Sequence, residues 1–128
     1  MSTQSRDEFI SSIARIAGSV YDFHERFGVS GPDGLAPTDD FVAVLRRRLP
    51  YLVEETGEHA KELNKGNLHD ASLELADVAF VALGSILLMD ASGKQACHAV
   101  AEKNDAKTNE THVFEKSSGK LVRRMNLS

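Results

Sequence analysis

A short apolar segment near the middle of the chain places the strongest limit on the fold. Between Val78 and Met89 only Ser85 is polar. A helix that is apolar all round must be buried on every side, and one small bundle of 128 residues can scarcely cover such a helix. We therefore expect an oligomer, a homodimer or homotetramer, in which another copy of the chain buries the face that its own chain leaves open.

The first part of the sequence predicts one helix followed by a loop. Ser5 with Glu8 fits a capping box, in which a side-chain oxygen and a carboxylate three residues later satisfy the first backbone N–H groups. Apolar residues then recur at alternating steps of four and three, which forms one stripe on a helix: Phe9, Ile13, Ile16, Val20, Phe23 and Phe27. Gly28 is a suitable stop, and residues 28–37, with three glycines and two prolines, predict a loop.

The remaining pattern predicts an all-α bundle of four or five helices with short connections. After a start at Thr38, Pro50 either kinks a helix or separates two. The predicted helices beyond the first cover about 38–49, 51–65, 67–89 and 94–108. A small hairpin is expected in the tail, 109–128, which we expect to be mobile within a single domain spanning 1–128.

Composition excludes several classes of protein. The formal net charge of −4 rules out a strongly basic protein that binds a nucleic acid polymer. A single cysteine, Cys97, excludes a disulfide framework and favours a reducing compartment. No uninterrupted apolar run reaches the roughly 18 residues of a membrane span, and residues 1–7 lack the pattern of a signal peptide. We therefore expect a cytoplasmic protein with no membrane partner.

Acidic side chains gather on two of the predicted helices. Four of them fall within one arc of about 100° on the helix that follows Pro50: Glu54, Glu55, Glu58 and Glu62. Glu74 and Asp77, three residues apart, share one face of the next helix where its apolar part begins. Acidic clusters are usually solvated faces, but two antiparallel helices joined at Gly66 would bring Glu55 and Glu58 opposite this second pair.

Such a cluster predicts a divalent cation. Burial of ionised groups is costly unless they are paired or bind a metal, and no lysine or arginine lies among these carboxylates. Ligands that are all oxygen favour Mg²⁺ or Mn²⁺ over Zn²⁺.

His59 lies beside the acidic motif without fitting a metal role. A di-iron bundle would supply Glu-x-x-His pairs, whereas Thr56 and Gly66 stand three residues before His59 and His69. His59 falls on the apolar side of its helix, so we interpret it as a hydrogen-bonded structural histidine.

The last predicted helix supplies the opposite charge. Lys103, Asn104 and Lys107 fall within one arc of about 100° on that helix. Lysine binds phosphate as a point charge, and lysines beside a carboxylate-bound cation would suit a polyphosphate. The alternative is that these are ordinary surface lysines.

These residues resemble a known family, the MazG-like all-α nucleoside triphosphate pyrophosphohydrolases. That superfamily also contains phosphoribosyl-ATP pyrophosphohydrolase and the dimeric dUTPases. Glu55–Glu58 followed by Glu74–Asp77 matches the family's E-x-x-E … E-x-x-D signature. The surrounding segments occur in the family's order, namely Phe23–Gly28, Arg46–Glu55, Leu73–Gly84 and Lys103–Lys107. The resemblance covers about residues 9–124.

The resemblance implies a function and a set of site residues. The family hydrolyses a nucleoside triphosphate to the monophosphate and pyrophosphate with Mg²⁺ or Mn²⁺, usually as a dimer or a tetramer of dimers, and here would clear unwanted nucleotides from the pool. By position, the metal ligands would be Glu55, Glu58, Glu74 and Asp77. Glu54 would be a further ligand or would orient the attacking water, and Glu54 and Glu55 would be the catalytic carboxylates. The phosphate contacts would be Lys103, Asn104, Lys107, Lys120 and Arg123, with Arg124 as another candidate. The candidates for the nucleobase are Phe23, His24 and Arg47.

Two alternatives stay open. The chain could be a phosphoribosyl-ATP pyrophosphohydrolase proper, although the extra segment 38–50 favours a general MazG-like or dUTPase-like member. It could also be a non-catalytic helical dimer that binds nucleotide or a protein partner, although the intact set of four carboxylates argues against this.

Overall fold

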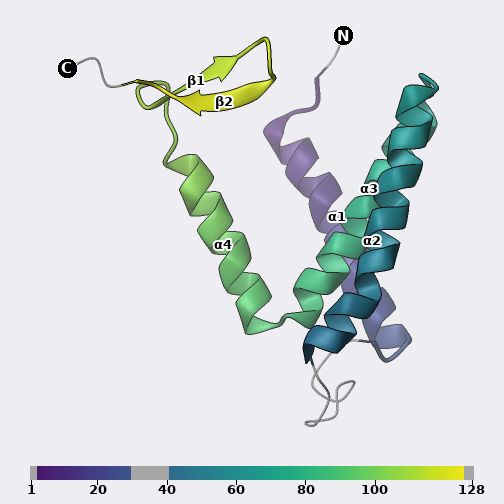
Figure 1. The fold of residues 1–128 in the computed structure, drawn as a ribbon. Coiled ribbons are helices and arrows are strands. Elements are labelled where there is room, and N and C mark those ends of the chain that lie inside the picture. Colours follow the sequence, from purple (N-terminus) through teal and green to yellow (C-terminus); the bar gives the residue numbers. More distant parts are fainter. Residues whose placement is uncertain (1–2, 30–40, 126–128) are drawn as a thin grey trace. The chain divides into compact units, whose positions relative to one another are not determined.

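The structure is a computed structural model that describes residues 3–29 and 41–125. Its elements are α1 (Arg6–Arg26), α2 (Phe41–Asn64), α3 (Leu68–Leu88), α4 (Ala91–Asp105), β1 (His112–Glu115) and β2 (Lys120–Arg123) (Figure 1). The contacts divide the chain into two compact units, Met1–Gly93 and Lys94–Ser128. The predicted all-α bundle with a short hairpin near its end is confirmed.

Helix α1 begins and ends where the sequence predicts. The Ser5 hydroxyl oxygen accepts a hydrogen bond from the backbone N–H of Glu8 at 3.1 Å, as in a capping box. Gly28 has a φ of +65°, and the N–H of Val29 donates to the carbonyl of His24 at 2.8 Å, which closes the last turn. The rest of the predicted loop, and the predicted helix start at Thr38, lie outside the described residues.

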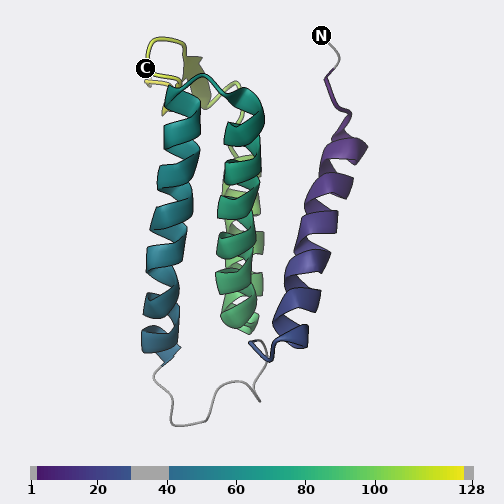
Figure 2. The same ribbon diagram turned by 90° about the vertical axis from the view of Figure 1, so that its right-hand side faces the viewer.

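Helices α2 and α3 form an antiparallel pair (Figure 2). The sequence left open whether Pro50 kinks one helix or separates two. Pro50 lies inside α2 and does not divide it, so there is one helix here. Gly66, with a φ of +77°, makes the tight turn at the end of α2. Asn67 then caps α3 by accepting a hydrogen bond from the N–H of Asp70 at 3.1 Å.

Helix α1 packs against the other side of α3, and the buried core is small. Among the described residues, the buried hydrophobic side chains are Val20, Ala71 and Leu88. The ring of Phe23 on α1 meets that of Phe80 on α3 edge to face, with centroids 5.5 Å apart. Most of the apolar segment of α3 is only half-buried within its own chain.

The three helices of the first unit meet at a polar junction. Arg48 of α2 donates from Nε to the hydroxyl of Ser85 at 2.9 Å and from Nη2 to the carbonyl of Val81 at 3.2 Å. His24 of α1 is 1% exposed and packs against the same place on α3. Its burial, together with the charge of Arg48, lowers the pKa of the imidazole, so His24 is neutral at pH 7. Gly84 leaves room for both side chains, since a Cβ there would clash with Arg48 and lie 2.7 Å from Nε2 of His24.

By length and composition, α3 is apolar enough to cross a membrane, with a mean hydropathy of 1.8 over its most apolar window. The core helix of a soluble protein has the same composition, and α3 lies between α1 and α2 (Figure 2). It also carries Glu74 and Asp77, whose charges are costly in hydrocarbon. Only 17% of the window is buried inside the chain, so much of its apolar surface is open.

The second unit consists of most of α4 and the hairpin. Asp90, with a φ of +53°, turns the chain between α3 and α4, and α4 begins and ends about three residues earlier than the sequence pattern predicts. In the hairpin, Val113 pairs with Val122 and Phe114 with Leu121. The predicted hairpin is therefore confirmed.

Substitution of Gly84 tests the polar junction. We expect Gly84→Ala to lower the free energy of unfolding by about 1–3 kcal/mol, because the new methyl group would displace Arg48 and His24. Gly18→Ala is the matched control: a Cβ at Gly18 meets nothing within 4 Å, and alanine in a helix interior should raise stability by about 0.5–1 kcal/mol. Urea denaturation followed by circular dichroism measures both changes. Equal stabilisation by the two substitutions would contradict this packing.

Candidate metal centre

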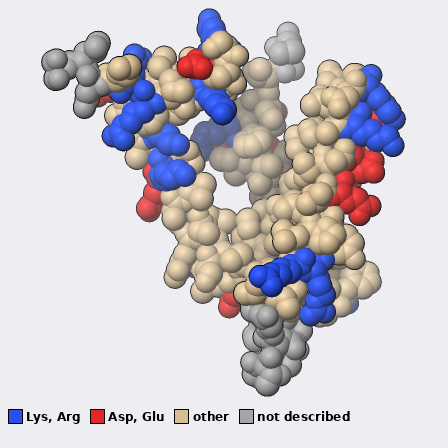
Figure 3. Space-filling model, viewed as in Figure 1, with Lys and Arg blue, Asp and Glu red and all other residues tan. Residues whose placement is uncertain are grey.

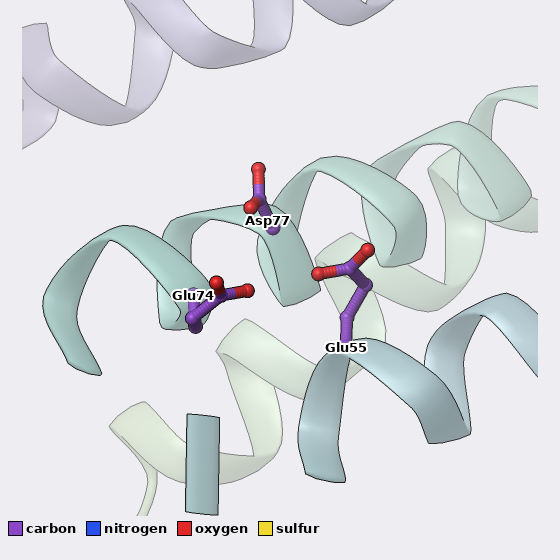
Figure 4. A group of neighbouring side chains, drawn as sticks. All are labelled: Glu55, Glu74 and Asp77. Carbon is purple, nitrogen blue, oxygen red and sulfur yellow. The ribbon is translucent and has the colours of Figure 1, made fainter. Parts of the chain in front are cut away.

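Three carboxylates from two helices converge on one point in the first unit. Glu55 comes from α2, and Glu74 and Asp77 come from α3. One carboxylate oxygen of each lies within 4.8 Å of the others. Figure 4 shows Glu55 extending from α2 toward the two acids on α3. Three separate oxygen donors at this spacing can bind a single small cation.

The helix pair explains this geometry. Glu74 and Asp77 are three residues apart and so lie on one face of α3. Cross-helix hydrogen bonds fix the register in which α2 faces them: His59 Nδ1 lies 2.7 Å from the carbonyl oxygen of Ala71, and Arg48 bonds to α3 farther along. The prediction that His59 is a hydrogen-bonded structural histidine is confirmed.

The electrostatics of the site favour a bound cation. Partial desolvation raises the pKa of Glu55; the negative charges of Asp77, Glu74 and Glu54 raise it further, and its neutral form gains a hydrogen bond with Glu74. Within residues 3–29 and 41–125, the one ion pair joins Lys65 to Glu62 at 3.5 Å and does not involve these three acids. A divalent cation would neutralise the repulsion among these carboxylates.

The donor set also fits the kind of metal that the sequence predicts. Only carboxylate oxygens converge here, and hard cations such as Mg²⁺ and Mn²⁺ prefer such ligands. Glu55 and Glu74 are half-buried and Asp77 is exposed. The site is therefore open on one side, where a substrate could contribute further oxygens.

The structure brings together three of the four predicted metal ligands. Glu58 lies one turn beyond Glu55 on α2, is exposed, and is not among the three converging carboxylates. Glu54 is exposed as well, and its charge acts on Glu55. Their roles as a fourth ligand and as a catalytic carboxylate stay predictions.

The predicted phosphate-binding residues all belong to the second unit. Near the end of α4, Lys107 Nζ donates to Asn104 Oδ1 at 3.0 Å, and Asn104 Nδ2 donates to the carbonyl of Val100 at 2.9 Å. Lys103 is exposed on the same helix, and the basic residues of the hairpin strand are Lys120 and Arg123. Lysine and arginine side chains gather over α4 and the hairpin (Figure 3). Their contact with phosphate stays a prediction.

The predicted nucleobase residues have different surroundings. Phe23 is 40% exposed, and Arg47 is exposed on α2. His24 is buried at the polar junction, where its Nδ1 has no hydrogen-bond partner among the described residues. Sequence reasoning missed Phe80, the aromatic partner of Phe23. Its signal was available, because Phe80 follows Asp77 by three residues and so lies on the same side of α3.

Neutralising Glu55 tests the electrostatics. Because its pKa is higher in the folded than in the unfolded chain, the metal-free protein loses stability as the pH rises from the usual carboxyl range through the raised pKa. At pH 7.5 we therefore expect Glu55→Gln to raise the melting temperature of the metal-free protein. Mn²⁺ at a hundred times its Kd should stabilise the wild type by about 2.7 kcal/mol, and this gain should be largely lost in the variant.

Differential scanning fluorimetry with EDTA or Mn²⁺ measures both effects. Glu62→Gln is the matched control, since Glu62 lies on the same helix and pairs with Lys65; it should keep the Mn²⁺ gain. A Glu55→Gln variant that is less stable without metal and equally stabilised by Mn²⁺ would contradict the repulsion.

Comparison with protein-family models matches residues 45–126 to the MazG nucleotide pyrophosphohydrolase domain. The match spans most of α2, all of α3 and α4, and the hairpin; it includes the three converging carboxylates and leaves α1 outside. Comparison with curated proteins and with solved structures gave no match. Since the family model covers more than half of the 128 residues, the chain belongs to the MazG nucleotide pyrophosphohydrolase family.

Proposed function

We propose that this protein hydrolyses a nucleoside triphosphate to the nucleoside monophosphate and pyrophosphate with the help of Mg²⁺ or Mn²⁺. The observation that carries the proposal is the convergence of Glu55, Glu74 and Asp77. These three acids lie within the segment that matches a family of nucleotide pyrophosphohydrolases. The family supplies the reaction class, and the absence of an ion pair to these acids among the described residues supports the requirement for a cation.

The carboxylates would divide the work of the reaction. Glu55, Glu74 and Asp77 would hold the divalent cation, and Glu58, one turn along α2, would extend the ligand set. When bound, the cation would neutralise the triphosphate and make its α-phosphorus more electrophilic. Glu54 would orient the attacking water and accept its proton. The exposed position of Glu54 beside Glu55 is consistent with that role.

Basic side chains of the second unit would bind the triphosphate. The candidates are Lys103, Asn104, Lys107, Lys120 and Arg123. Lysine and arginine would hold the non-bridging oxygens and stabilise the charge of the departing pyrophosphate. All five candidates lie within the segment that matches the family model.

The aromatic pair of the first unit offers a surface for the nucleobase. Phe80 lies one turn beyond Asp77 on α3, and its partner Phe23 is partly exposed. An aromatic ring can stack on any of the bases, and such stacking contributes about 1–3 kcal/mol per base. Arg47 is the further candidate for this contact.

Loss of single carboxylates tests the reaction. We expect Asp77→Asn and Glu58→Gln each to lower kcat at least about 100-fold, because loss even of residues that only support a metal ligand costs 10–100-fold. The helical circular dichroism should be unchanged. Pyrophosphate release from a panel of ribo- and deoxyribonucleoside triphosphates with Mg²⁺ measures the effect.

Glu62→Gln again serves as the control and should turn over like the wild type. Retained activity in both site variants would contradict the assignment. The same panel distinguishes the alternatives: release from phosphoribosyl-ATP alone would identify that enzyme. Nucleotide binding without any release would identify a non-catalytic sensor.

The open apolar surface supports a homo-oligomer. In the first unit, large hydrophobic side chains are exposed on all three helices: Phe9, Ile10, Ile13, Leu49, Val53, Leu73 and Leu75. We propose that another copy of the chain covers these side chains, since large contiguous apolar patches mark interaction surfaces. We expect light scattering after gel filtration to give the mass of two or four chains of 14.0 kDa. A fully active species with the mass of one chain would contradict this expectation.

A further inference from the structure

The metal centre lies between two cross-helix connections that join α2 to α3. On the side toward the α2–α3 turn, His59 contacts the carbonyl of Ala71 at 2.7 Å. On the other side, Arg48 donates to the carbonyl of Val81 and to the hydroxyl of Ser85. Both connections link a side chain of α2 to α3, so both restrain the register of the pair.

The His59 connection is the nearer of the two to the carboxylates. His59 follows Glu55 by four residues, so it lies one turn along α2 from Glu55, where the acidic arc borders the apolar side of the helix. Ala71 precedes Glu74 by three residues, again one turn along α3. Arg48 stands seven residues before Glu55, about two turns away.

The chemistry of this bond fixes which nitrogen carries the proton. A carbonyl oxygen can only accept a hydrogen bond, so Nδ1 of His59 must be the donor. A bond of 2.7 Å is short for a nitrogen donor, and His59 and its partner are both shielded from bulk water to some degree. The bond therefore ties the backbone of α3 to a defined position on α2.

The acidic group needs such a restraint. One carboxylate oxygen each of Glu55, Glu74 and Asp77 lies within 4.8 Å of the others, and repulsion among these acids favours rotation or separation of the two helices. A metal site requires ligand atoms held within about 0.5 Å of their working positions. A bond one turn from Glu55 and one turn from Glu74 restrains the very movement that the repulsion drives.

We propose that His59 is a positioning residue of the metal centre: its N–H bond to the Ala71 carbonyl holds Glu55 against Glu74 and Asp77 at a spacing that suits a divalent cation. The proposal rests on the metal-dependent function proposed above. His59 acts through these carboxylates and is not itself a ligand.

Two substitutions at this position separate positioning from general stability. His59→Leu keeps apolar bulk and a strong helix former but removes the donor. His59→Asn keeps an N–H donor at the place of Nδ1, although asparagine is the weaker helix former. Ser85→Ala is the matched control, because it removes one bond from the Arg48 connection at more than two turns from Asp77.

The readouts are the Kd for Mn²⁺, from the free-ion signal in electron paramagnetic resonance, and the melting temperature of each metal-free variant. We expect His59→Leu to weaken Mn²⁺ binding about tenfold, as for other residues that orient metal ligands, and His59→Asn to stay within about threefold of wild type. Ser85→Ala should lower the melting temperature with Mn²⁺ affinity within about twofold of wild type. The Mg²⁺ concentration for half-maximal turnover should follow the same order.

Each contrary result has a distinct meaning. If Mn²⁺ affinity instead follows the melting temperatures, or is unchanged in His59→Leu, the positioning role is overturned while the metal centre stands. A wild-type protein that binds no Mn²⁺ overturns the proposed function itself. Nitrogen-15 NMR of the wild-type imidazole gives a test that needs no variant. The Nδ1–H tautomer supports the proposal, and a neutral ring protonated at Nε2 overturns it.

Discussion

The repulsion among three carboxylates on two paired helices is the interaction on which the rest of the site depends. Glu55, Glu74 and Asp77 offer oxygens within 4.8 Å of one another, and partial desolvation together with the neighbouring negative charges raises the pKa of Glu55. Without a bound metal, the pairing of α2 and α3 is less stable because it holds these acids together. A divalent cation would make the same arrangement favourable. The geometry that lowers the stability of the metal-free protein is therefore the one that metal binding requires.

The surrounding structure opposes that repulsion in several ways. The tight turn at Gly66 makes α2 and α3 antiparallel neighbours. Cross-helix bonds from His59 and Arg48 fix the register on both sides of the acids. Gly84 makes room for the guanidinium of Arg48 and for the buried imidazole of His24, which brings α1 against α3 as well. The apolar end of α3 then anchors a helix whose other end is acidic.

Much of this arrangement follows from local patterns in the sequence. The capping box at Ser5, the end of α1 near Gly28, the hairpin and the opposition of Glu55 to Glu74 and Asp77 are confirmed, because each depends on short-range spacing. Tertiary choices were harder to predict. Whether Pro50 divides α2 depends on packing along the whole helix, and the bonds of Arg48 depend on a gap at Gly84 that no periodicity reveals. The position of Glu58 outside the converging group depends on side-chain geometry that helix spacing leaves open.

Crystallography of the protein with Mn²⁺, with anomalous data collected at the manganese absorption edge, tests the central claim most directly. The account predicts an anomalous peak between α2 and α3 within about 2.5 Å of carboxylate oxygens from Glu55, Glu74 and Asp77. Three acids turned toward bulk solvent with no peak between them, or neutralised by an arginine, would contradict it.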